Sequence, residues 1–310
     1  MSAIPSTLSF LDVSGSLGAL ENGTLLGIFL FGIETLQTFH YYRHFSQDSN
    51  LLKAVVGFVW VLELGHTISA WHALYSQTIT FYGQPGHILS PAVSEETTII
   101  FAALIYTVVQ AFFANRVRVL SGRWYIMALA CVLGLLRLVG HVGIVALLLH
   151  YSRVTIVLEW RWLVTSSLSL DLSVDLLITA SLCYCLWNMR SCESKRTRTM
   201  VDTLILWAIE STILTSAASV IQIILFMTRN DLVWEGVFVI QAKLFSNAML
   251  ASLNGRKNFR ECTNIDVVSD INFRLSHRKP DTSTTSCVDM RGQRSFDVET
   301  NEKKGGSSSI

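Results

Sequence analysis

Seven apolar stretches of bilayer length dominate the sequence. A helix rises about 1.5 Å per residue, so roughly 20 consecutive apolar residues cross the hydrocarbon core of a membrane. The candidate spans are 23–42, 52–75, 97–119, 124–149, 162–188, 202–228 and 232–254. Lipid offers no hydrogen bonds to the backbone, so spanning segments of this kind must be helical. The sequence therefore predicts an all-α membrane protein that folds as a seven-transmembrane helix bundle.

The composition agrees with this class. Hydrophobic residues make up 51% of the chain and charged residues 15%, whereas soluble proteins average about 25% charged residues. The formal net charge is only +1, which gives no bulk attraction to nucleic acid. We therefore expect the lipid bilayer to be a partner of this protein and nucleic acid not to be one.

The basic residues of the loops predict an orientation. Cytoplasmic loops of membrane proteins collect Lys and Arg. The loops after the first, third and fifth spans hold nine of these residues, and the segments on the opposite side hold three. We expect the N-terminus outside, the C-terminus in the cytoplasm, and a location in the plasma membrane rather than in an internal membrane.

Three regions follow from this topology. Residues 1–22 form a short extracellular segment, residues 23–257 form the seven-transmembrane domain, and residues 258–310 form a cytoplasmic tail. The tail is polar and rich in Ser and Thr, so we expect it to be disordered. The connection 76–96 is longer than the others and holds two of the four prolines. We expect it to form a lid or a vestibule.

Ionisable side chains inside the spans are the candidate functional residues. Lys243 lies near the middle of the last span, and a charge in hydrocarbon is costly unless it faces the bundle interior. The full set is Glu34, Glu63, His66, Arg137, His141, Asp171, Asp175, Glu210 and Lys243. Several of these lie at similar depth, which predicts a polar layer inside the bundle. That layer is our candidate binding site for a small molecule or a proton.

Helical spacing predicts one group of partners in this layer. Arg137 and His141 are four residues apart, as are Asp171 and Asp175 on the next span. Residues at this spacing share a helix face. We therefore predict that Arg137 pairs with Asp171 and Asp175.

A second pairing follows from ring closure. In a closed ring of seven helices the last lies against the first, so we predict that Lys243 pairs with Glu34, with Glu63 as the alternative. The spans hold five carboxylates and two permanent bases. Some carboxylates must then be protonated, or be balanced by a cation or by His66 and His141. Ion pairs that only fix the helix register are the structural alternative.

Small residues and prolines give further indications. Gly23 and Gly27 form a GxxxG pair in the first span, which predicts close helix packing there. All four prolines lie outside the spans. Unbroken helices argue against a transporter with discontinuous helices and against a rhodopsin-class receptor.

No two histidines and an acid have the HExxH spacing, so we expect no metal site, no cofactor and no enzymatic activity.

The second half of the chain resembles a known family. The segments that show the resemblance are DLLITASLCYCL from Asp175, LILWAIESTILTS from Leu204 and KLFSNAMLASLNGR from Lys243. They resemble a large family of seven-helix membrane proteins from mushroom-forming fungi, domain of unknown function 6534, over residues 165–257. The resemblance implies a fungal integral membrane protein and assigns no activity. The residues that match its pattern are Asp175, Glu210, Lys243, Asn247, Asn254 and Arg256.

Three function classes stay open at this stage. The first is a receptor-like or sensory protein that binds a small molecule or a proton in its polar interior. Its basic cytoplasmic face and its Ser/Thr-rich tail predict a cytoplasmic signalling partner. The second is an ion-coupled or proton-coupled transporter or channel, and the third is a membrane scaffold without a ligand.

Overall fold

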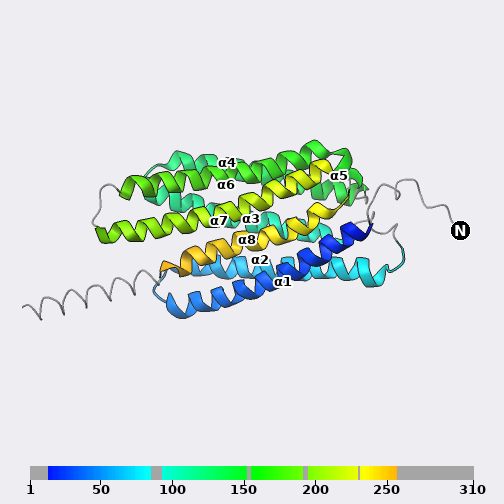
Figure 1. Ribbon diagram of the computed structural model, residues 1–310, viewed down its shortest axis with the longest axis horizontal. Coiled ribbons are helices and arrows are strands. Elements are labelled where there is room, and N and C mark those ends of the chain that lie inside the picture. Colours follow the sequence, from blue (N-terminus) through cyan, green and yellow to red (C-terminus); the bar gives the residue numbers. More distant parts are fainter. Residues whose placement is uncertain (1–12, 85–92, 152–154, 191–194, 230, 257–310) are drawn as a thin grey trace, which may run out of the picture. The chain divides into compact units, whose positions relative to one another are not determined.

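The computed structural model describes residues 13–84, 93–151, 155–190, 195–229 and 231–256, which contain helices and no strand (Figure 1). The long helices are α1 (Val13–His44), α2 (Asn50–Tyr75), α3 (Val93–Ser121), α4 (Trp124–Tyr151), α6 (Arg161–Arg190), α7 (Lys195–Thr228) and α8 (Val233–Asn254). A π-helix, η2 (Ser76–Thr80), extends α2, and α5 (Thr155–Glu159) is a single short turn. These helices belong to one unit, Met1–Cys262, and the second unit, Thr263–Ile310, lies outside the described residues.

Six of the described helices are long and apolar enough to cross a membrane: α1, α2 with η2, α3, α4, α6 and α8. In α7 the described side chains include a shorter apolar helical segment, Thr212–Thr228. Large apolar side chains also cover the outer surface of the bundle, for example Phe29, Trp71, Leu136 and Val139. Such a surface suits lipid and not water. The protein is therefore a helical, multi-pass membrane protein.

Two helix boundaries differ from the predicted ones. α1 begins at Val13, within the segment 1–22 that we expected to lie outside the bundle. This extension is held by α8, because the hydroxyl of Ser16 accepts a hydrogen bond from the backbone N–H of Leu232 (3.2 Å). The predicted connection 76–96 is shortened by η2 and by the start of α3, and its residues 85–92 lie outside the described residues, as does the predicted tail.

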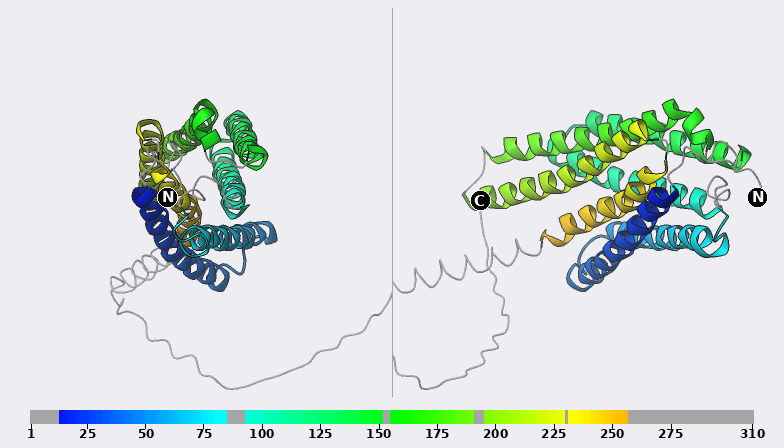
Figure 2. Two further views of the ribbon diagram at one scale, coloured as in Figure 1. Left: turned by 90° about the vertical axis from the view of Figure 1, so that its right-hand side faces the viewer. Right: turned by 45° about the vertical axis from the view of Figure 1, so that its right-hand side comes forward.

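The long helices pack side by side in chain order and form a ring that α8 closes against α1. The view along the bundle in Figure 2 shows this ring, with α8 between α1 and α7. α3 and α8 also contact each other across it. α8 is the most buried of the six candidate spans. In its apolar stretch 61% of the residues are buried inside the protein, against 28% in α1. α8 is therefore the member of the ring that is most enclosed, because it contacts α2 and α3 as well as its two neighbours.

Glycine permits a very close crossing of α1 and α8. A Cβ atom added to Gly23 would collide with the backbone of Gly236, and one added to Gly236 would collide with the backbone of Ala19. This confirms the predicted close packing at Gly23. The crossing fixes where the rest of α1 lies relative to α8.

Candidate functional site

Lys243 of α8 is buried and fully hydrogen-bonded. Its ammonium donates to the carboxylate of Glu63, to the backbone oxygen of Glu63 (3.0 Å) and to Oγ1 of Thr67 (2.6 Å). The hydroxyl of Ser246 donates to the other carboxylate oxygen of Glu63. The ring of Phe31 lies 5.1 Å from the ammonium. All three ammonium protons thus have acceptors, which offsets the cost of burying the charge.

The predicted pairing of Lys243 with Glu34 is wrong, and the alternative, Glu63, is confirmed. The ammonium turns to α2 because that helix supplies a carboxylate, a backbone oxygen and a hydroxyl together. From α1 it meets the ring of Phe31 and no oxygen. Glu34 is fully buried, and neither of its carboxylate oxygens has a hydrogen-bond partner among the described residues.

His66 completes this group of ionisable residues. It is fully buried, and both of its ring nitrogens lack hydrogen-bond partners within the described part of the chain. Glu34 is within electrostatic reach of Glu63 and Lys243, and His66 is within reach of Lys243. We call Glu34, Glu63, His66 and Lys243 the Lys243 cluster. It sets two carboxylates against one ammonium.

Arg137 forms the second buried ion pair, as predicted. Its Nη1 donates to Oδ1 of Asp171 (2.8 Å), and its Nη2 donates to Oγ1 of Thr107 (3.0 Å). The guanidinium lies 5.3 Å from the ring centre of Tyr106. His141 Nδ1 bonds the backbone oxygen of Arg137, and its Nε2 lies 4.0 Å from Asp171. We call Arg137, His141, Asp171 and Thr107 the Arg137 cluster.

Asp175 does not join the Arg137 cluster, so that part of the prediction is wrong. Its carboxylate faces α7 and accepts hydrogen bonds from Thr215 (2.5 Å) and Ser216 (3.4 Å). One helical turn beyond Asp171 is enough to reach a different neighbour, because α6 packs against α7 as well as against α4.

An aromatic pair lies between the two clusters. The rings of Tyr106 on α3 and Phe245 on α8 are 5.1 Å apart, and both side chains are buried. Tyr106 contacts Arg137 and His141 of one cluster and is within electrostatic reach of Glu63 of the other. The polar interior is therefore divided into two sites.

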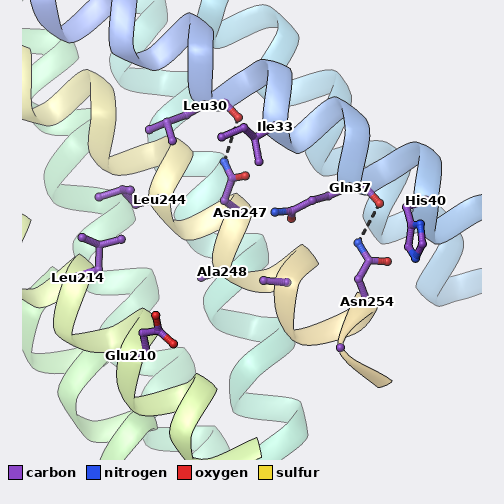
Figure 3. Close-up of a pocket in the computed structure, with 12 residues that line it drawn as sticks. Leu30, Ile33, Gln37, His40, Glu210, Leu214, Leu244, Asn247, Ala248 and Asn254 are labelled. Carbon is purple, nitrogen blue, oxygen red and sulfur yellow. Dashed lines mark hydrogen bonds between the residues drawn. The ribbon is translucent and has the colours of Figure 1, made fainter. Parts of the chain in front are cut away.

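A ligand-sized cleft lies at the side of the bundle, between α1 and α7, with α8 as its floor (Figure 3). Its volume is about 590 Å³. Leu214 and Leu244 are among its apolar walls, and Gln37 and Glu210 supply polar groups. Glu210 is exposed in this cleft, so the structure separates it from both buried clusters.

Two asparagines tie the cleft to α1 and α8. The amide of Asn247 donates to the backbone oxygens of Lys243 (2.8 Å) and Leu30 (3.2 Å), and that of Asn254 donates to the backbone oxygen of Gln37 (2.9 Å). The side-chain oxygens of both asparagines and of Gln37 have no hydrogen-bond partner among the described residues. These oxygens are buried within the wall formed by α1 and α8, whereas the carboxyl group of Glu210 is exposed in the cleft.

A second cleft, of about 660 Å³, opens between the start of α2 and the end of α3, next to the end of α8. Arg116 donates to the hydroxyl of Ser252 there. Arg256 pairs with Asp48 (2.5 Å) and lies 4.8 Å from the ring centre of Phe45. The end of α8 is thus tied to α3 and to the connection between α1 and α2.

Sequence reasoning missed the neutral partners of the charged groups. Thr67 follows Glu63 by four residues and Ser246 follows Lys243 by three, so helical spacing alone identifies both as neighbours. Thr107 and Thr215 lie on helices distant in sequence from the groups they bind. No spacing signal identifies such contacts.

Comparison with known families matches residues 171–258 to a family of unknown function, DUF6534. The matched segment runs from within α6 to the end of α8 and includes Asp171, Asp175, Glu210 and Lys243. Comparisons with curated proteins and with solved structures gave no match. The second half of the bundle is thus similar to a family without an assigned activity.

Proposed function

We propose that this protein is a receptor-like seven-helix membrane protein that binds a small amphiphilic molecule in the cleft between α1 and α7. In this proposal α7 also crosses the membrane and brings the number of spans to seven. The N-terminus lies outside and the C-terminus in the cytoplasm of a fungal cell, at its plasma membrane. The six apolar helices, the loop charges and the family resemblance support this view. The proposal includes no enzymatic step.

The cleft is the observation that carries the proposal. Its volume of about 590 Å³ lies within the usual range for small-molecule sites, about 300–1,000 Å³. Its apolar walls suit an alkyl chain or a ring system. Glu210 is exposed in the cleft, and a carboxylate only accepts hydrogen bonds. The ligand class that fits is an amphiphile with an amine or hydroxyl head.

The cleft is connected to a buried ion pair through α8. Asn247 lies on the floor of the cleft and donates to the backbone oxygen of Lys243, whose ammonium holds Glu63 on α2. Near the end of the same helix Ser252 contacts Arg116, and just beyond the helix Arg256 contacts Asp48. We propose that a ligand which shifts α8 alters these end contacts, on the face that receives a cytoplasmic signalling partner.

Photo-crosslinking tests the ligand site. Purified full-length protein in lipid nanodiscs is labelled with photoreactive long-chain amine, alcohol and carboxylic acid probes of equal chain length. We expect the amine and the alcohol to label peptides of α1, α7 and α8, and the acid to label them weakly because of Glu210. Ala251→Phe, which fills the cleft, should abolish labelling. Ala180→Phe, an exposed alanine of α6, is the matched control.

Two results would contradict this site. Labelling spread evenly over the lipid-facing helices would show that the probes report only the surrounding bilayer. Equal labelling of the Ala251→Phe and wild-type proteins would show that the cleft is not where the probes bind.

The Lys243 cluster favours a second candidate, a proton-coupled transporter. Glu34 and His66 are fully buried, and their polar side-chain atoms lack hydrogen-bond partners among the described residues. Buried carboxylates and histidines form the proton relays of pumps and transporters. Proteoliposomes with an internal pH-sensitive dye distinguish the two functions. Proton flux that Glu34→Gln removes would support transport, whereas absence of flux across a broad substrate panel would favour the receptor.

A further inference from the structure

A small cavity inside the bundle is lined by oxygen-bearing side chains from three helices. Its volume is about 30 Å³, enough for one water molecule or one small ion. The polar residues that line it are Gln110 of α3, Asp175 and Thr179 of α6, and Thr212 and Thr215 of α7. Its other walls are apolar, including Phe113 and Phe245.

Asp175 has no cationic partner at this cavity. Its carboxylate accepts hydrogen bonds from the hydroxyls of Thr215 (2.5 Å) and Ser216 (3.4 Å). Among the described residues no Lys, Arg or His lies within ion-pair distance of it, since Arg137 is paired with Asp171. Hydroxyl donors partly satisfy an ionised carboxylate, but they leave its charge uncompensated inside the membrane.

Gln110 is a second polar residue at the same cavity whose hydrogen bonding is incomplete. Its side chain is 5% exposed, and neither its amide oxygen nor its amide nitrogen has a hydrogen-bond partner in the described part of the chain. The hydroxyl of Thr179 forms a hydrogen bond with that of Thr212 (2.6 Å), and the oxygen of Thr179 keeps a second lone pair in this bond. The cavity thus combines one uncompensated charge with several oxygens that have capacity to bind.

We propose that this cavity binds one sodium ion, coordinated by oxygens of Asp175, Thr179, Thr215 and Gln110. Hard cations prefer carboxylate, carbonyl and hydroxyl oxygens. A monovalent ion matches the single carboxylate, whereas a divalent ion would leave an excess positive charge in a medium of low dielectric constant. The small volume favours sodium over potassium.

This site differs from a cluster of His, Cys, Asp or Glu ligands, since no group of three or more such residues that could hold a metal occurs in the described residues. It is also independent of the proposed ligand cleft. Its ligands come from α3, α6 and α7, so the bound ion ties these three helices together. A ligand that binds only the folded state stabilises it, and sodium therefore stabilises the bundle.

Thermal unfolding of the purified full-length protein in detergent tests this inference. The melting temperature is measured in NaCl, KCl and choline chloride at equal ionic strength, and binding of radioactive 22Na⁺ is measured directly. We expect NaCl to raise the melting temperature by about 3 °C or more over choline chloride, with saturation at one site. KCl should have a smaller effect.

Variants assign the effect to this cavity. Asp175→Asn should abolish both the sodium-dependent shift and 22Na⁺ binding, whereas Glu21→Gln removes an exposed carboxylate of α1 and should keep both. If Asp175→Asn does not fold, Thr179→Val and Gln110→Leu should each weaken sodium binding several-fold. Equal melting temperatures of the wild type in NaCl and choline chloride, or sodium binding that survives Asp175→Asn, would overturn the proposal.

Discussion

The two buried ion pairs of this bundle differ in how completely their charges are matched. In the Arg137 cluster one guanidinium faces one carboxylate, and a second guanidinium nitrogen donates a hydrogen bond to Oγ1 of Thr107. In the Lys243 cluster one ammonium faces Glu63, while Glu34 and His66 remain without hydrogen-bond partners among the described residues. The first site has one carboxyl group for its one permanent cation, whereas the second has two carboxyl groups for its one ammonium.

This difference separates a structural role from a responsive one. An arginine keeps its proton in proteins, whereas lysine, glutamate and histidine change protonation state when their surroundings change. The Arg137 cluster therefore fixes the packing of α3, α4 and α6. The Lys243 cluster can change its charge, and it lies one helical turn from the cleft residue Asn247.

The largest expected loss of stability is at the Arg137 cluster. Asp171→Asn leaves Arg137 charged and unpaired, because the guanidinium cannot give up its proton. We expect the free energy of unfolding to fall by about 3–5 kcal/mol, measured by chemical denaturation in detergent. The double variant Arg137→Met/Asp171→Asn should recover most of the loss. A double variant as unstable as Asp171→Asn alone would contradict the ion-pair explanation.

At the Lys243 cluster we expect a smaller loss in the free energy of unfolding. Lys243→Met leaves Glu63 without its cation, but a carboxylate can become neutral by taking up a proton. We expect a loss of about 1–3 kcal/mol. In a double-mutant cycle, Lys243→Met and Glu63→Gln should couple by more than about 1 kcal/mol, and Lys243→Met with Glu34→Gln should couple less. Stronger coupling to Glu34 would restore the pairing that the sequence predicted.

The helix crossing at Gly23 should affect the Lys243 cluster and spare the Arg137 cluster. Gly23→Ala forces α1 away from α8 and should lower the free energy of unfolding by about 1–3 kcal/mol. Gly32→Ala, on the same helix with open space around it, is the matched control and should be neutral or stabilising. Infrared spectra of the carboxylates should change in Gly23→Ala only. Equal effects of the two substitutions would show that the crossing does not need glycine.

The smallest effect is expected at Glu34. Glu34→Gln removes no hydrogen bond or ion pair that the structure shows, so the free energy of unfolding should stay within about 0.5 kcal/mol of the wild-type value. The same denaturation assay measures it. A loss above about 2 kcal/mol would reveal a stabilising partner of Glu34 and would remove the contrast between the two sites.

Residue patterns predicted the helices and one ion pair for clear physical reasons. Long apolar runs leave the backbone no alternative to a helix in lipid, and the spacing of Arg137, His141 and Asp171 on consecutive helices led directly to their contact. The partner of Lys243 was harder to predict, because its long side chain reaches both α1 and α2 and turns to the helix with more acceptors. Here that helix is α2, through Glu63 and Thr67.

The cleft was not predictable from the sequence. Lipid-facing and buried faces of a membrane helix are both apolar, so periodicity does not show which residues line a gap between helices. The position of Glu210 depends on the space between α1 and α7. The close crossing of α1 and α8 at Gly23 and Gly236 is likewise evident only in three dimensions.

An experimental density map of the protein in lipid nanodiscs tests the central claim most directly. The claim is that Lys243 and Arg137 face inward and form two separate ion pairs, with Glu63 and with Asp171. We expect density for the Lys243 side chain to reach Glu63 and density for Arg137 to reach Asp171, with Tyr106 and Phe245 between the pairs. A map in which Lys243 or Arg137 extends toward lipid without a carboxylate would contradict it.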